Sequence, residues 1–158
     1  EACKQIKLKG NLIKIRFVGN ISENQLNNFE IAGLKENLEI IKYVPHKESI
    51  RYLFNSSVLL LVIPETKGNK EIITGKLFEY MATGIPVLGI GPLDGDAAKI
   101  IEKSGSGKIF ECNQGKEVCI FIIEIMKGRF EIKNKELIKQ FNRKSITGQL
   151  IQNIIKEE

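Results

Sequence analysis

A run of six apolar residues, Val58 to Ile63, limits the fold of this chain more than any other segment. No polar side chain interrupts the run, so it has no polar face to turn toward water. An uninterrupted apolar run of this length is typical of a strand inside a parallel sheet, where helices cover both faces. The sequence therefore predicts that this segment lies in the interior of an α/β sheet.

Strand-like and helix-like segments alternate about five times along the chain, with short connections. The expected strands are 13–19, 38–44, 58–63, 86–90 and 108–110, with helices between them and two further helices from Lys135 and Ser145. Ser22 and Gln25 form a capping box at one helix start, and Gly84 ends another helix. The pattern predicts one Rossmann-like domain over residues 1–158, a doubly wound parallel α/β sheet with helices on both faces.

Composition and charge narrow the possible partners and location. The 24 basic and 19 acidic residues are scattered and only three Tyr are present, which favours a solvated surface over nucleic-acid binding. The net charge of +5 is compatible with weak attraction to an anionic membrane surface. We find no apolar run of membrane-spanning length and expect no signal peptide. Three cysteines without CxxC spacing indicate a reducing compartment, so we expect a cytoplasmic protein, with peripheral contact at the inner face of a membrane as an option.

The stretch from Glu71 to Gly91 carries the strongest sign of a ligand site. Thr74 and Gly75 open a short helix, and a helix N-terminus at the carboxyl end of a strand binds anions through its free N–H groups and dipole. Glu71 and Glu79 stand on either side of this helix start with seven residues between them. Either acid alone is better explained as a solvated surface residue, but together they can accept hydrogen bonds from sugar hydroxyls. The stretch predicts a ligand with phosphate and hydroxyl groups.

Two glycine-rich segments offer other ligand sites. Gly89, Gly91 and Gly95 stand between a strand and a helix like a dinucleotide fingerprint, which keeps open an NAD(P)-binding oxidoreductase domain. Pro92 within the segment weakens that interpretation. The segment fits better as a turn whose N–H groups contact a phosphate or a sugar. The GSGK at 105–108 lacks P-loop spacing and leads into a strand, so we interpret it as a turn.

Metal and acid–base motifs are weaker. Asp94 and Asp96 have the spacing of a DxD metal site, but their position before a helix favours capping, so no metal is expected. His46, the only histidine, stands at a helix start, where a surface or capping role is favoured over catalysis. A non-enzymatic receiver-like domain would need clustered acids at a strand end with a phosphorylatable Asp, and the segment 58–64 ends without any Asp.

Three successive segments resemble the carboxyl-terminal domain of family 4 (group 1) glycosyltransferases: LEIIKYVPHKESIRYLFNSSVLLLVIP, the E-x7-E pair, and KLFEYMATGIPVLGIGPLDGDAAKIIEKSGSGKIF. The resemblance covers nearly the whole chain and is most specific between Glu71 and Pro86. These enzymes have the GT-B fold, in which two Rossmann-like domains face each other across a cleft. The carboxyl-terminal domain binds a nucleotide-diphosphate sugar, and the amino-terminal domain brings the acceptor.

The resemblance implies a donor domain for a UDP- or GDP-linked sugar, without a cofactor. It implies retaining transfer to a saccharide or lipid-linked acceptor hydroxyl, in surface polysaccharide or glycoconjugate synthesis. The chain opens like the end of a helix, which predicts a part of a longer protein whose amino-terminal acceptor domain is absent here. By itself the domain is expected to bind a nucleotide weakly and to transfer nothing.

The resemblance also implies a role for each matching residue. Glu79 would bind the ribose hydroxyls, and Glu71, the predicted catalytic residue, would bind hydroxyls of the transferred sugar. The other predicted donor contacts are Thr74, Gly75 and Lys76 at the diphosphate, Tyr43, Val44 and Pro45 at the base, and Gly91. The sequence departs from the family pattern in two places. The family's upstream Arg and Lys pair is missing, and Asn20 does not substitute for it. Ile72 and Ile73 stand where the family often has small or aromatic residues.

Overall fold

The computed structural model describes residues 2–3, 6, 13–141 and 145. The strands are β1 (Ile15–Val18), β2 (Leu38–Ile41), β3 (Leu59–Val62), β4 (Val87–Ile90) and β5 (Gly107–Phe110). The helices are α2 (Glu23–Ile31), α3 (His46–Phe54), α4 (Gly75–Thr83), α5 (Asp96–Ser104), α6 (Gly115–Met126) and α7 (Lys135–Gln140), with short 3-10 turns η1 (Lys35–Asn37) and η2 (Asn69–Glu71). The predicted opening helix end and the helix predicted from Ser145 lie almost wholly outside the described residues.

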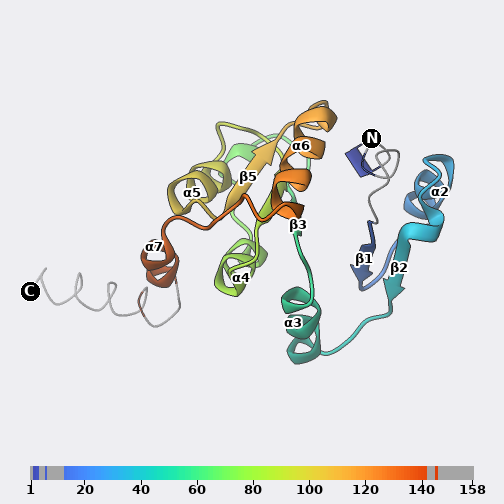
Figure 1. Cartoon of the computed structure of the whole chain (residues 1–158), viewed down its shortest axis with the longest axis horizontal. Helices are drawn as coiled ribbons and strands as arrows, with labels where there is room; N and C mark the ends of the chain where they lie inside the picture. The colour runs from blue at the N-terminus through green and yellow to red at the C-terminus, as the bar shows by residue number, and fades with distance from the viewer. Residues whose placement is uncertain (1, 4–5, 7–12, 142–144, 146–158) are drawn as a thin grey trace, which may run out of the picture.

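The predicted parallel α/β fold class is confirmed. β1 pairs with β2, β3 with β4, and β4 with β5, and every pair is parallel. Helix α4 links β3 to β4, and α5 links β4 to β5 (Figure 1). Because parallel neighbours need a crossover connection, the alternation of strands and helices in the sequence left little other choice of architecture.

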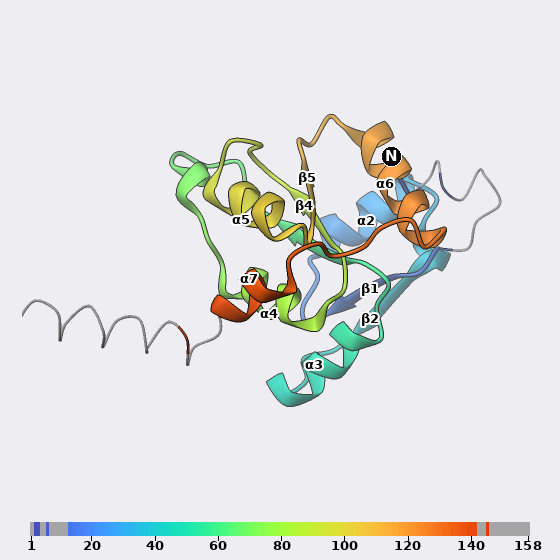
Figure 2. The same ribbon diagram turned by 60° about the vertical axis from the view of Figure 1, so that its left-hand side comes forward.

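Helices cover both faces of the sheet formed by β3, β4 and β5. On one face, Leu77 and Met81 of α4 and Ile101 of α5 pack with Leu61 and Val87 of the strands. On the other face, α6 packs its apolar side over β4 and β5, through contacts among Leu88, Phe110, Val118, Phe121 and Ile122. Figures 1 and 2 show α5 and α6 on opposite sides of β5. The arrangement is doubly wound, as predicted.

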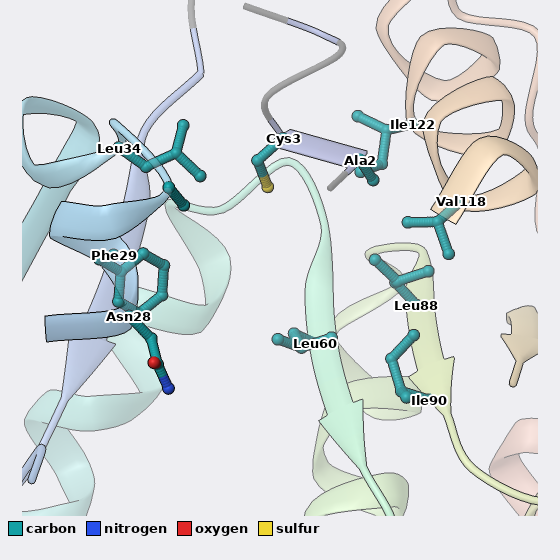
Figure 3. A pocket seen from close by; sticks show the side chains of 11 residues that line it. Ala2, Cys3, Asn28, Phe29, Leu34, Leu60, Leu88, Ile90, Val118 and Ile122 are labelled. Atoms are coloured by element: carbon teal, nitrogen blue, oxygen red, sulfur yellow. The ribbon is translucent and has the colours of Figure 1, made fainter. Parts of the chain in front are cut away.

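The hydrogen bonds divide the strands into two sheets, β1–β2 and β3–β4–β5, where the sequence indicated one. A cavity of about 290 Å³ lies between the two parts. Figure 3 shows Phe29 and Leu34 on its α2 side, and Leu88 and Val118 on the opposite side. No ladder joins β1 to β3 within the described part of the chain.

The prediction that both faces of the Val58–Ile63 strand are covered is wrong. Leu59 and Leu61 are buried, but Leu60 is 50% and Val62 is 56% exposed. The buried residues face α4 and α5, whereas α6 covers β4 and β5 on the opposite face without burying a residue of β3. Leu60 therefore lines the cavity between the two sheets instead of a covered face.

Local signals at helix ends were mostly confirmed. Ser22 and Gln25 form the capping box that starts α2, and Gly84 ends α4 with a φ of 73°. Gly105 ends α5 with a φ of 59° and β5 begins at Gly107, so only Gly105 and Ser106 form the turn, and the segment leads into a strand as predicted. The predicted capping of α5 by aspartate is wrong, because Gly95 is the N-cap and no side chain closes the cap.

Candidate functional site

The N-terminus of α4 has unpartnered polar groups. Thr74 occupies the N-cap position as predicted, but its side chain makes no capping hydrogen bond. Its Oγ1 is buried without a partner among the described residues. The N–H of Leu77 donates to the Thr74 carbonyl, at 3.1 Å, whereas no described residue accepts from the N–H groups of Gly75 and Lys76. Free N–H groups and the helix dipole together make this end of α4 suitable for an anion.

The side chains around this helix start leave it open. A Cβ placed on Gly75 would meet no atom within 4 Å. Lys76 lies exposed in the first turn and forms no ion pair with a described residue. An anionic ligand can therefore approach the backbone at Gly75 with a free cation beside it.

The two predicted acids stand on different elements. Glu71 ends the turn η2 and is exposed, whereas Glu79 lies one turn into α4 and is 47% exposed on its side chain. Both carboxylates are accessible to a ligand from solvent. The roles assigned to them by resemblance remain predictions.

The structure brings His46, the residue after the predicted base segment, next to the predicted ribose acid. Pro45 is the N-cap of α3 and His46 its first residue, and His46 Nε2 lies 3.8 Å from Glu79 Oε1. Tyr43, just before this start, is 82% exposed. Sequence reasoning missed the contact with Glu79, although a lone histidine directly after the predicted base segment was an available signal. The contact joins two segments that are more than thirty residues apart in sequence.

The glycines of the segment 89–95 are explained by packing. A Cβ on Gly89 would lie 2.8 Å from Ile109 Cγ1, and one on Gly91 would lie 2.8 Å from Ile63 Cβ. The N–H of Gly91 donates to the Phe110 carbonyl at 2.9 Å, so it is not free for a phosphate. These positions accommodate close packing of β3, β4 and β5, and a dinucleotide fingerprint is not favoured. Any contact of Gly91 with a nucleotide-sugar donor would involve atoms of Gly91 other than its N–H, and this contact stays a prediction.

An ion pair fastens the turn that carries Glu71. Lys70 Nζ lies 2.5 Å from Asp94 Oδ2, which links η2 to the loop after β4. This hydrogen bond, more than any other interaction, lowers the pKa of Asp94 below its ordinary value. Asp94 and Asp96 thus pair with lysines, the second with Lys99, instead of capping α5.

Asp94 is expected to titrate at a lower pH than an ordinary aspartate. Because its pKa is lower in the folded than in the unfolded state, the ion pair contributes stability above the unfolded pKa, and this is lost as the pH falls through the folded pKa. Carboxyl-carbon NMR of the Lys70→Met variant should show the Asp94 pKa moving up toward its ordinary value. Lys99→Met, which removes a weaker influence on Asp94, should move it less. An unchanged Asp94 pKa in Lys70→Met would show that η2 is not fastened in solution.

Two known proteins are similar to this chain, one in sequence and one in fold. No protein-family model matches the chain. The putative colanic acid biosynthesis glycosyltransferase WcaL of Salmonella typhimurium strain LT2 is 26% identical over 160 residues, covering 95% of this chain and 39% of that protein. Sucrose-phosphate synthase from Thermosynechococcus elongatus matches in structure with a TM-score of 0.69, over 99% of this chain and 42% of that one. These likenesses support a GT-B glycosyltransferase domain of the carboxyl-terminal type.

The likeness to sucrose-phosphate synthase, at 16% sequence identity, bears on the fold alone. The chain spans about two fifths of the length of both proteins, 39% and 42%. The oxidoreductase alternative is not favoured, since both comparisons lead to GT-B proteins and the glycines at 89–95 serve packing. Among its described residues, no helix has the length and apolar character needed to cross a membrane.

Proposed function

We propose that this domain binds a UDP- or GDP-linked sugar as the donor half of a retaining glycosyltransferase. The observation that carries the proposal is the contact between His46 and Glu79. His46 directly follows the predicted base segment, Tyr43 to Pro45, so the contact supports a base bound near the acid that would bind the ribose. Both lie on or next to α4, whose N-terminus has free N–H groups.

The spacing along α4 supports a nucleoside diphosphate. Gly75 and Glu79 are four residues apart in the helix, an axial distance of about 6 Å. That distance suits a ligand whose diphosphate contacts the helix start and whose ribose hydroxyls reach the acid one turn later. Lys76 adds a positive charge near the diphosphate. The Thr74 hydroxyl, which has no partner among the described residues, gains a hydrogen-bond acceptor if the hydroxyl turns toward the diphosphate.

In this proposal the domain contributes mainly electrostatic stabilisation and positioning. Charge develops on the diphosphate as it leaves, and the N–H groups at Gly75 together with Lys76 stabilise it. Glu71 holds hydroxyls of the transferred sugar, so that the acceptor hydroxyl attacks the face from which the diphosphate leaves. The Glu71 role rests on the resemblance in sequence and on its exposed position after η2.

The proposal extends to a second domain that brings the acceptor, since both GT-B proteins compared are more than twice as long as this chain. The acceptor would be a saccharide or a lipid-linked saccharide, in surface polysaccharide or glycoconjugate synthesis. The colanic acid role in the name of the relative supports this context. A cytoplasmic location with peripheral membrane contact stays part of the proposal.

Calorimetric titration of the 158-residue chain with UDP, GDP and NADH tests the proposal directly. One of the two nucleoside diphosphates is expected to bind weakly at the start of α4. NADH is expected to show no heat of binding, because the glycines at 89–95 serve packing and do not form a dinucleotide fingerprint. Binding of NADH alone would restore the oxidoreductase interpretation. Absence of binding by all three at millimolar concentration would contradict the donor-domain proposal, and sugar transfer by this chain alone would contradict the need for a second domain.

A further inference from the structure

A hollow of about 270 Å³ opens at the carboxyl ends of β3, β4 and β5. The loops after these three strands supply its wall, with Glu65 and Asn69, then Gly91 and Pro92, then Glu111, Cys112 and Asn113. We call this surface the acidic hollow. Open parallel α/β sheets bind their ligands at this edge. The acidic hollow is thus a concave surface at the edge where a ligand is expected, and the donor contacts described above do not use most of it.

The acidic hollow adjoins the proposed donor site through one turn. Asn69 begins η2 and lines the hollow, and Glu71 ends the same turn. Lys70, between them, is held by Asp94 of the loop after β4. A sugar that contacts Glu71 therefore lies within one short turn of the acidic hollow.

The volume of the acidic hollow suits a small ligand. Drug-sized ligands occupy pockets of roughly 300–1,000 Å³, and the hollow lies just below that range. Its volume corresponds to about nine water molecules at their share of the liquid. A single sugar ring fits such a space, whereas a whole nucleotide sugar does not.

The charges of the wall are of one sign. Glu65 and Glu111 contribute two carboxylates, and no Lys, Arg or His is among the residues of the wall. The Cys112 thiol shares a hydrogen bond with Glu65, which raises the pKa of the thiol above its ordinary value and keeps it neutral near pH 7. The two carboxylates accept hydrogen bonds from hydroxyl and ammonium groups and repel a further carboxylate, whereas the amides of Asn69 and Asn113 can both accept and donate.

We propose that the acidic hollow holds the transferred sugar ring and selects a neutral or amino sugar against an acidic one. This rests on the proposed function, because the nucleotide brings the sugar to this edge of the sheet. Glu65 and Glu111 take sugar hydroxyls, and Asn69 and Asn113 complete the polar wall. A uronic acid ring adds a carboxylate beside both acids, and repulsion at about 4 Å in water lowers affinity about fivefold for each.

Alkylation of Cys112 reports occupancy of the acidic hollow in the unmodified chain. Cys112 is exposed and Cys119 is buried. Peptide mass spectrometry after brief N-ethylmaleimide treatment measures the rate at which Cys112 is alkylated, and Cys119 serves as an internal reference. The probes are UDP, UDP-glucose, UDP-galactose, UDP-N-acetylglucosamine and UDP-glucuronate, or GDP, GDP-mannose and GDP-mannuronate, according to which diphosphate binds in calorimetry. A neutral-sugar nucleotide at ten times its Kd should slow the reaction about tenfold, while the diphosphate alone leaves the rate nearly unchanged.

The outcomes separate this inference from the proposed function. If the neutral-sugar nucleotides bind in calorimetry but Cys112 reacts as fast as with the diphosphate, the sugar lies elsewhere and the inference is overturned, while the donor function stands. If the acidic-sugar nucleotide protects Cys112 as well as the neutral ones, the selectivity is overturned. If no nucleotide binds, the proposed function itself fails, and the inference fails with it.

A carboxylate variant tests the selectivity from the protein side. Glu111→Gln should raise affinity for the acidic-sugar nucleotide about fivefold relative to the neutral one, because one repulsion is removed. Glu117→Gln is the matched control, since Glu117 is an exposed acid in the first turn of α6 outside the wall. An unchanged affinity ratio in Glu111→Gln, with Glu65→Gln also without effect, would show that these carboxylates do not face the sugar.

Discussion

Replacement of Glu79 by alanine is expected to lower the affinity of the domain for its nucleoside diphosphate tenfold or more. A carboxylate that accepts hydrogen bonds from ribose hydroxyls contributes about 1.5–3 kcal/mol. The carboxylate is 47% exposed, so it is accessible to a ligand and its loss leaves no buried cavity. Binding should therefore weaken without loss of fold, which calorimetry and circular dichroism measure on the same sample.

Two further variants test whether the loss of nucleotide affinity in Glu79→Ala is specific to the Glu79 carboxylate. Glu102→Ala removes an exposed acid from α5, away from α4, and should bind as the unmodified chain does. His46→Ala removes the neighbour of Glu79 at 3.8 Å, and an exposed pair of this kind is worth about 0.2–1 kcal/mol, so its effect should be smaller. If Glu79→Ala binds the diphosphate as tightly as Glu102→Ala, the assignment of Glu79 to the ribose is wrong.

Replacement of Gly107 by alanine is expected to destabilise the fold by about 3 kcal/mol or more, at the upper end of overpacking effects. A Cβ at this position would lie 1.9 Å from the Val87 carbonyl oxygen and 2.7 Å from its carbon. Gly107 is the register partner of Val87 in the β4–β5 ladder, and Val87 is fully buried between α4 and α5. The clash is with backbone, so no side chain can turn away to relieve it.

Urea unfolding followed by circular dichroism measures this loss, which is a large part of the 5–15 kcal/mol that stabilises an ordinary domain. Gly75→Ala is the control, because its Cβ would meet nothing within 4 Å and alanine favours a helix by about 0.5–1 kcal/mol over glycine. We expect Gly75→Ala to unfold at the same or a higher urea concentration. Equal midpoints for Gly107→Ala and the unmodified chain would mean that β5 does not pair with β4 at this register.

Local signals in the sequence determined much of the fold. The Ser22–Gln25 capping box and the Gly84 helix end depend on residues within a few positions, and both formed as predicted. The parallel sheet followed from apolar runs separated by helices, because each connection has to cross over. Such features need no knowledge of distant contacts, so a single sequence contains them.

The candidate site could be predicted in part. Glu71 and Glu79 were identified by their spacing around one helix start, and the structure gives both an accessible position. The N–H of Gly91 was predicted to face a ligand but is bonded to Phe110, because the glycine serves close packing against Ile63. Sequence pattern cannot separate a glycine needed for packing from one needed for a ligand.

Only the tertiary structure decided which groups meet. The contact of His46 with Glu79, the ion pair of Lys70 with Asp94, and the acidic hollow each join segments that follow different strands. The exposure of Leu60 likewise depends on where α2 and α6 stand relative to β3. The sequence by itself determined the elements, their parallel order and the acids around α4, since these follow from local propensity and periodicity. Which connecting segments become neighbours depends on the order of the strands in the sheets. That order is settled only when the whole core packs.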